Sequence, residues 1–563
     1  MDEAVYSSDK ISTGLALELE TSQVKQSSVT LDRTFTIILR YLGTFSNIRR
    51  LTDVPMIPLL NQFAIGTATK EAILQLSKHP EILYLDITRQ MEYEQAVSVQ
   101  SRLSSCFPMY TDDVQHLSGS GILVGIVDSG IDFLHPAFQR ADSTNRVLAY
   151  WDQDAAGTSP QPYGFGKKYS STQINTITKE GSDYKSYDRS GHGTAVASIV
   201  AALSPEADLI GVATRPNTAS FLCAVDYIVR FAMQQASPLV LNLSYGNNYG
   251  DHQGHAITEL YLESLRANGK ITIVTGMGNE GNTGRHRHIE GNTQQTTGIL
   301  ISSGIHLLNL QLWFAANYRF YFQFFSPNGE RTMYYDSGNP GFFYQTISKN
   351  TVLSIQIGQS TPYNSNREIF IQIEGNPIPY GYWNLFILPY LNQPYQIDAW
   401  LPVASSIEAN VEFELPTTEL SLTIPASLKS IISVGAYNQT QLSIASFSGK
   451  GGGIVQKPDI ISPGVDVLAA NTAGGYSLQS GTSFSTPFVT AAAANLMQWG
   501  ITEGRDPFLY GERLKTYLTT SARPLPGNQF IPNYAEGWGR LCANASIPNA
   551  NTKILPDSNI DDF

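Results

Sequence analysis

The chain has 563 residues, too many for one ordinary domain, so its length predicts two to four units. Its 42% hydrophobic and 15% charged residues are typical of a well-packed globular protein and exclude an intrinsically disordered one. A formal net charge of −12, without a run rich in Lys and Arg, argues against a nucleic-acid partner.

Two further features bear on the compartment. The sequence begins MDEAVYSSDK, which has neither the basic region nor the apolar stretch of a secretory signal, and no apolar run reaches the roughly 20 residues of a membrane span. We therefore expect synthesis and retention in a cytoplasm, or in a compartment derived from one. The three cysteines, Cys106, Cys223 and Cys542, fit neither a disulfide framework nor a zinc motif and are interpreted as small buried hydrophobes.

Residues 1–95 form the first of four predicted units. The segment 34–43 (TFTIILRYLG) predicts a strand, 68–80 a helix that stops at its final proline, and 81–87 a second strand. A small α+β unit follows from this pattern.

Residues 96–290 alternate between strand and helix signals. GILVGIVDSG is a continuous apolar run that predicts a strand buried on both faces, and PLVLNLSYG and KITIVTGMG predict two more. GTAVASIVAAL predicts a helix of small residues. Such alternation is typical of an α/β fold with a parallel sheet.

Residues 291–420 are crowded with aromatic side chains in short alternating runs, which turn residues separate. The pattern predicts an all-β sandwich or jelly roll inserted into the α/β domain. The aromatics could line a binding surface, but core packing is the interpretation we favour. Residues 421–563 return to the α/β pattern, with a helix in GTSFSTPFVTAAAANLMQWG and an acidic tail.

Three segments supply the groups that a hydroxyl nucleophile needs, namely a base and a residue that orients the base. Asp128 ends the first buried strand, at the edge where open α/β sheets bind ligands. His192 lies in RSGHGTAVAS, and Ser483 lies in SGTSFSTP at an expected helix N-terminus, which favours an anion. Singly they could be a turn former, a structural histidine and a helix cap. Together, in the order Asp, His, Ser, they form a highly specific pattern.

The segments VGIVDSGID, SGHGTAVASIVAA, GNEG, KPDIISPG and GTSFSTP resemble the signature blocks of the subtilases. The resemblance covers the second and fourth units nearly completely. It implies a subtilisin-like serine endopeptidase in which Ser483 attacks the scissile carbonyl, His192 shuttles the proton and Asp128 holds His192. It also implies an oxyanion hole formed by Asn279 and the backbone N–H of Ser483.

The segment SYGNN (244–248) is similar to the substrate-binding strand of the family. The resemblance implies that an extended peptide pairs with this strand and that a primary specificity pocket lies beside it. The residues implied are Ser244, Tyr245, Gly246 and Gly278. For Ser244 and Tyr245, simple strand packing is the alternative. Phe484 and Ser485 depart from the Met and Ala usual after the nucleophile, which predicts altered packing rather than inactivity.

With the β insertion and the intact triad, the whole chain resembles the Csp germination proteases of spore-forming clostridia. This resemblance implies that residues 1–95 are a prodomain that chaperones and inhibits the core. It also implies a spore-associated enzyme whose substrate is the zymogen of a cortex-lytic enzyme. A catalytically silent regulatory module and a general degradative intracellular subtilase are the alternatives. No cofactor is expected; family members often bind calcium in loops, but no D-x-D-x-D-G run indicates it here.

The end of the first unit, YLDITRQMEYEQ, is expected to run as an extended strand into the active-site cleft and to pair near Ser244. The next segment, AVSVQSRLSS, resembles the start of mature bacterial subtilisins. We therefore predict autocleavage between Gln95 and Ala96, with Gln95 in the primary pocket and Tyr93 two residues upstream. The alternative is that 81–95 is only a linker.

Overall fold

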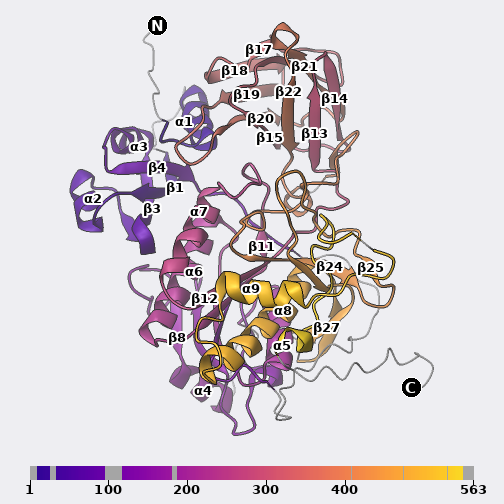
Figure 1. The fold of residues 1–563 in the computed structure, drawn as a ribbon. Coiled ribbons are helices and arrows are strands. Elements are labelled where there is room, and N and C mark those ends of the chain that lie inside the picture. The colour runs from indigo at the N-terminus through magenta and orange to yellow at the C-terminus, as the bar shows by residue number, and fades with distance from the viewer. Residues whose placement is uncertain are drawn as a thin grey trace.

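The structure is a computed structural model that describes residues 9–25, 33–94, 117–180, 187–407, 409–472, 474–528 and 530–548. Figure 1 shows an N-terminal unit and a body of β-strands at one end of the molecule, with the central sheet and its helices at the other. Within these ranges, no helix is both long and apolar enough to cross a bilayer.

The N-terminal unit is an antiparallel sheet with helices against it. The strand order is β2-β3-β1-β4, and β1 pairs with both β3 and β4. The strands are β1 (Thr34–Tyr41), β2 (Met56–Pro58), β3 (Phe63–Thr69) and β4 (Ile82–Ile87). The helices are α1 (Thr13–Lys25), α2 (Phe45–Leu51) and α3 (Lys70–Ser77). The unit has a hydrophobic core of its own, which includes Ile37, Leu39 and Ile73.

The central sheet has the order β25-β24-β12-β10-β6-β9-β7-β8, and β26 also pairs with β24. Its interior pairs are parallel, as the alternation of strands and helices predicts. The first strands are β6 (Leu123–Asp128), β7 (Val147–Asp152), β8 (Lys167–Ser170), β9 (Asp208–Ala213), β10 (Leu239–Leu243) and β12 (Ile271–Gly276). The others are β24 (Ile432–Asn438), β25 (Ser443–Ile444) and β26 (Ile460–Pro463).

Helices cover both faces of the central sheet. On one face, α5 (His192–Leu203) and α8 (Thr482–Met497) pack against each other and against Val124 and Ile126 of β6. On the other, α6 (Thr218–Gln234) and α7 (Ile257–Ser264) pack over Leu123 and Val127. Alternate residues of β6 thus pack into the cores on opposite faces of the sheet, which explains why the strand is a continuous apolar run. Other elements of this body are α4 (Ser171–Glu180), α9 (Gly511–Thr520), β27 (Val467–Ala470) and β28 (Tyr476–Gln479).

Between β12 and β24 the chain forms two antiparallel sheets around one shared core. Their orders are β13-β22-β15-β20-β19-β18 and β17-β16-β21-β14-β23. The first sheet contains β13 (His286–Gly291), β15 (Leu307–Ala315), β18 (Gly341–Ser348), β19 (Thr351–Ile357), β20 (Asn366–Gly375) and β22 (Tyr395–Trp400). The second contains β14 (Gln295–Ile301), β16 (Phe320–Phe325), β17 (Tyr335–Asp336), β21 (Gly381–Pro389) and β23 (Val411–Phe413).

Many aromatic side chains of this insertion face its core, among them Phe320, Phe322 and Trp383, so core packing accounts for their abundance. The first strand begins at residue 286, before the expected boundary at 291, because β13 pairs with the distant β22. Helix α1 of the N-terminal unit packs against β19 and β20, and Gln311 of β15 donates a hydrogen bond to the carbonyl of Asn248 in the α/β core. The insertion therefore touches both other bodies (Figure 1).

Candidate active site

Asp128 and His192 form a buried hydrogen-bonded pair. Asp128 is the last residue of β6, and His192 is the first residue of α5. The Nδ1 of His192 lies 2.7 Å from Oδ1 of Asp128, and both side chains are buried. Gly193 permits this approach, because a Cβ there would lie 2.1 Å from the carbonyl oxygen of Gly130.

A second layer of hydrogen bonds holds this pair. The backbone N–H of Ser129 donates to Oδ1 of Asp128 at 2.7 Å. The hydroxyl of Ser129 donates to Asp188 at 2.6 Å and accepts from the N–H of Gly193 at 2.9 Å. Burial raises the pKa of Asp128, while the neighbouring His192 acts to lower it. The imidazole is therefore fixed in orientation beside a carboxyl group shielded from water.

Ser483 lies in the first turn of α8 and is fully buried. Its hydroxyl donates to the carbonyl oxygen of Ser244 at 3.5 Å. The Nε2 of His192, which would have to accept the serine proton, has no hydrogen-bond partner within the described residues. The ring of His192 lies 5.3 Å from that of Phe484, the residue after the serine.

Two hydrogen-bond donors lie near the start of α8, namely the backbone N–H of Ser483 and the side-chain amide of Asn279, which is bonded to Thr482. The backbone N–H of Ser483 donates to the carbonyl oxygen of Glu94 at 3.2 Å. The Oδ1 of Asn279 accepts from the N–H of Thr482 at 3.1 Å. The Nδ2 of Asn279 is buried and has no partner among the residues described. The amide of Asn279 is thus held by its oxygen, and its nitrogen is a spare donor.

The segment before Gln95 lies across the site as an extended strand. β5 (Glu92–Tyr93) pairs antiparallel with β11 (Tyr245–Gly246), with Tyr93 opposite Tyr245. The N–H of Glu94 donates to the carbonyl of Ser244 at 3.4 Å. The ring of Tyr93 packs on the rings of His192 and Tyr245, with centroids 4.9 and 4.4 Å away.

The side chain of Glu94 fills a pocket with glycines in its wall. Its Oε1 accepts from the hydroxyl of Thr423 at 2.7 Å, and its Oε2 accepts from that of Thr482 at 3.2 Å. A Cβ at Gly246 would lie 2.7 Å from Oε1, and one at Gly276 would lie 2.0 Å from Oε2. Burial raises the pKa of this carboxyl to about 7. Any larger residue at these glycines would close the pocket.

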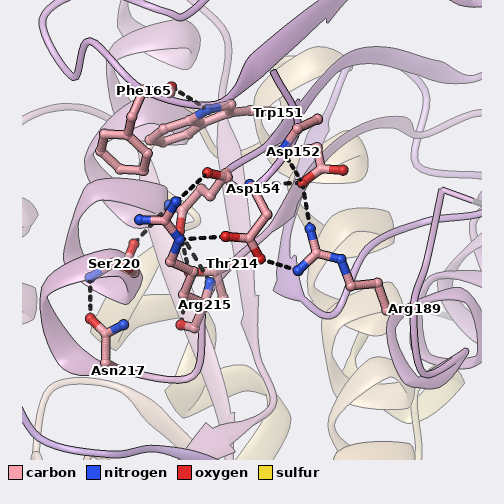
Figure 2. A network of polar contacts seen from close by, with 11 residues as sticks. Trp151, Asp152, Asp154, Phe165, Arg189, Thr214, Arg215, Asn217 and Ser220 are labelled. Atoms are coloured by element: carbon pink, nitrogen blue, oxygen red, sulfur yellow. Dashed lines mark hydrogen bonds and ion pairs between the residues drawn. The ribbon is translucent and has the colours of Figure 1, made fainter. Parts of the chain in front are cut away.

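A polar network links Asp154 to Arg189 and Arg215, which come from different segments of the α/β core (Figure 2). Asp154 pairs with Arg189 and with Arg215, whose Nε lies 2.5 Å from Oδ1 of Asp154. Arg189 directly follows Asp188, and Arg215 precedes Pro216, whose carbonyl accepts from the N–H of Met91 at 3.0 Å. Because both arginines are well exposed, we assign the network a role in loop geometry rather than in stability.

The sequence model of the subtilase family matches residues 119–309 and 410–539, which together make up more than half of the chain. The chain belongs to the subtilase family. The unmatched stretch 310–409 falls within the inserted sheets.

Individual relatives match over shorter stretches. The thermophilic serine proteinase of Bacillus sp. (strain AK1) is 40% identical over 76 residues, which are 14% of this chain and 18% of that protein. Subtilisin BL of Lederbergia lenta is 32% identical over 105 residues, which are 19% and 35% of the two chains. The chain thus spans about a third or less of the length of these curated relatives.

One solved structure is similar over most of its length. The structure of the Clostridium perfringens CspB protease superposes with a TM-score of 0.71 and 27% sequence identity. The match covers 76% of this chain and 93% of that one. This subtilase therefore has the subtilisin-like α/β fold and is similar to a Csp protease.

The structure gathers the predicted binding residues of this subtilase around the strand 91–94. The carbonyl of Ser244 accepts from both Glu94 and Ser483, and Tyr245 packs on Tyr93. Gly246 lies opposite Glu92 in the β5–β11 pair. Gly278 has a φ of +80°, and a Cβ there would lie 2.4 Å from Thr423.

The pocket lined by Thr423 and Thr482 holds Glu94, whereas the sequence argument placed Gln95 in the primary pocket. Tyr93 thus lies one residue upstream of the residue in this pocket rather than two. Gln95 and Ala96 lie outside the described residues, so cleavage between them stays a prediction. The register is set by the β5–β11 pairing and by the hydrogen bond from Ser483 to Glu94, neither of which a resemblance to mature N-termini encodes.

The sequence argument missed three members of the site: Glu94, Thr423 and Thr482. Thr482 stands directly before Ser483 in GTSFSTP, and Glu94 lies in the predicted extended strand, so the sequence could have indicated both. Thr423 belongs to no motif. Only the folded chain brings it to the pocket.

Proposed function

We propose that this chain is a serine endopeptidase that first cuts itself after Glu94 and then acts on a protein substrate. One observation carries the proposal: the carbonyl oxygen of Glu94 accepts a hydrogen bond from the N–H of Ser483. A peptide carbonyl thus occupies the place where an oxyanion would need stabilising. The family membership and the Asp128–His192 pair add support.

The proposed reaction follows from these groups. Oγ of Ser483 attacks the carbonyl carbon of Glu94 while Nε2 of His192 accepts its proton, and Asp128 stabilises the imidazolium. The N–H of Ser483 and Nδ2 of Asn279 donate to the oxyanion. His192 then protonates the leaving nitrogen, and the C–N bond breaks. Water, deprotonated by His192, hydrolyses the acyl-enzyme and restores Ser483.

In this proposal, residues up to Glu94 act as an inhibitory prodomain that remains docked after the cut. Its strand β5 occupies the cleft, and other contacts do not depend on the broken bond. The N–H of Leu60 donates to Asp226 at 2.8 Å, and Nδ2 of Asn61 donates to Asn268 at 2.6 Å. These bonds join the N-terminal unit to the core through residues outside β5.

As the physiological substrate we propose the zymogen of a spore cortex-lytic enzyme, cut once during germination by a spore-associated protease. The similarity to a CspB protease over most of its chain supports this, as does the inserted pair of sheets. Denatured casein and one native zymogen should be compared as substrates. Faster cleavage of casein would favour a degradative enzyme.

A catalytically silent regulatory module is the second candidate. It is favoured by the hydroxyl of Ser483, which donates to Ser244, and by Nε2 of His192, which has no partner among the described residues. A fluorophosphonate probe separates the two candidates, because only an activated serine reacts with it. Labelling of Ser483 in the processed protein supports the enzyme, and its absence supports the silent module.

Mass spectrometry of the purified chain tests the cut. The wild type is expected to yield a new N-terminus at Gln95, whereas Ser483→Ala should remain one full-length chain. A new N-terminus at Ala96 would contradict the register proposed here. Cleavage of the Ser483→Ala protein at the same bond, in a host without related proteases, would show that processing is not autocatalytic.

A further inference from the structure

The carboxyl group of Glu94 is enclosed by uncharged partners. The residue is 4% exposed, and its oxygens meet the hydroxyls of Thr423 and Thr482. The backbone of Gly278 provides a further hydrogen bond. A carboxylate taken out of water normally requires a cation as well as hydrogen bonds.

The titratable groups around this carboxyl supply no fixed positive charge. His192 at the start of α5 is the group whose charge acts on it. Glu92 on the same strand and Glu280 after β12 line an adjoining cavity of about 380 Å³, together with Glu94. No lysine or arginine in the described ranges is paired with Glu94. This balance of charges disfavours an ionised side chain in the pocket.

The hydrogen bonds of the Thr482 hydroxyl also favour an uncharged side chain in the pocket. Its oxygen lies 3.2 Å from Oε2 of Glu94 and 3.2 Å from Oδ1 of Asn279, yet a hydroxyl has one hydrogen to donate. When that hydrogen goes to Asn279, the oxygen facing Glu94 is an acceptor. A protonated carboxyl or a carboxamide NH₂ can then donate to it, whereas a carboxylate cannot.

We propose that the primary pocket selects an uncharged glutamate or a glutamine at the residue before the cut, with the hydroxyls of Thr423 and Thr482 as specificity determinants. The proposal rests on the proposed endopeptidase function and adds its substrate class. Such substrates are protein segments that place Glu or Gln at the cut.

The pocket then makes binding of a glutamate side chain dependent on pH. The pKa of Glu94 rises from 4.5 to about 7 when the side chain is buried in the pocket. The bound form therefore holds its proton more tightly than the free form. Binding is strongest below about pH 4.5, weakens about tenfold per unit as the pH rises toward about 7, and then levels off. A glutamine side chain does not titrate and shows no such loss.

The first test does not depend on catalysis. In the full-length Ser483→Ala chain, Glu94→Gln is expected to raise the thermal midpoint, by an amount that grows from pH 5 to about 7 and then stays constant. Glu92→Gln is the matched control, because Glu92 interacts with Gln90 outside the pocket, and its effect should not follow this pH profile. An unchanged midpoint for Glu94→Gln at every pH would overturn the proposal.

The second test uses peptides that copy residues 89–98, with Gln, Glu or Leu at position 94, and active-site-titrated enzyme. The ratio of kcat/KM for Gln over Glu should rise roughly 30-fold between pH 5.5 and pH 8, and the ratio cancels the titration of His192. Thr423→Val should lower kcat/KM about tenfold or more for Gln and for Glu, but not for Leu.

The outcomes separate the two proposals. Hydrolysis of all three peptides with a constant Gln-to-Glu ratio would overturn the pocket assignment and leave the endopeptidase function standing. Failure to hydrolyse any peptide, with no fluorophosphonate labelling, would overturn the endopeptidase function. The thermal midpoints of the Ser483→Ala chains would then still decide which side chain the pocket accepts.

Discussion

The backbone N–H of Ser483 donates to the carbonyl oxygen of Glu94 at 3.2 Å, although the two residues are far apart in the sequence. In the proposed endopeptidase, this bond places the end of the N-terminal unit in the register of a substrate. It also makes Nδ2 of Asn279, buried and without a partner in the described part of the chain, the natural second donor.

Asn279→Ala is therefore expected to lower kcat by about 10²–10³ with little change in KM, because the lost donor acts mainly on the transition state. Asn279→Asp should lower kcat as well, since it keeps an acceptor for Thr482 but lacks the donor. Steady-state kinetics on a peptide substrate measures both. Asn410→Ala is the control, because this exposed asparagine lies outside the site. A kcat within threefold of wild type for Asn279→Ala would remove Asn279 from the mechanism.

Asp128→Asn should lower kcat by about 10³–10⁴ while the fold is kept, as such a change does in other serine proteases. Oδ1 of Asp128 meets His192, and Oδ2 is buried with no partner among the residues described. An asparagine must either bury its NH₂ without an acceptor or turn it toward Nδ1 and impose the wrong tautomer. Burst-corrected kcat and circular dichroism test this. Asp142→Asn, in an exposed turn, should leave both unchanged.

The sequence could predict those parts of the site whose residues lie in one continuous motif, and not those that only tertiary folding brings together. Asp128, His192 and Ser483 each stand in a motif with its own strand or helix signal, so their elements could be predicted. The pocket could not be predicted, because Thr423 and Thr482 meet Glu94 only through tertiary folding. Helix α1 was missed for a similar reason. Its apolar residues Leu15 and Leu19 join the core of the N-terminal unit, and contacts with β19 and β20 complete its packing.

The inserted sheets should resist excision by limited proteolysis, because they have their own core and are bonded to the catalytic body. The side chain of Gln311 donates to the carbonyl of Asn248 at 2.8 Å and accepts from the N–H of Gly250 at 3.1 Å. Gln311→Ala leaves both buried groups unpaired and is expected to speed excision severalfold. Gln396→Ala, on an exposed position of β22, is the control. Rapid excision from the wild type would contradict a fixed insertion.

Arg89→Ala should weaken the docking of the N-terminal unit on the α/β core and on the insertion. The guanidinium of Arg89 lies 5.0 Å from the ring centroid of Tyr249 and 4.7 Å from that of Phe370. It also acts to lower the pKa values of Asp86 and Glu368, which burial raises, that of Glu368 to about 7. Without the arginine, these two carboxyls face each other with less compensation.

The expected loss is about 1–2 kcal/mol, which corresponds to roughly tenfold faster release of the cleaved unit and a matching gain in peptidase activity. Release should grow as the pH rises toward 7, because the raised pKa of Glu368 favours docking in the protonated form.

Arg89→Lys keeps the charge but not the planar stacking, so its rate of release should lie between those of the wild type and Arg89→Ala. Arg33→Ala removes an exposed arginine that pairs with Glu18 inside the same unit, and it should have no effect on release. Size-exclusion chromatography of the cleaved complex at pH 6 and pH 8, with peptidase assays on the same fractions, measures both quantities. Equal release from the wild type and Arg89→Ala would show that the core contacts of Leu60 and Asn61 hold the unit by themselves.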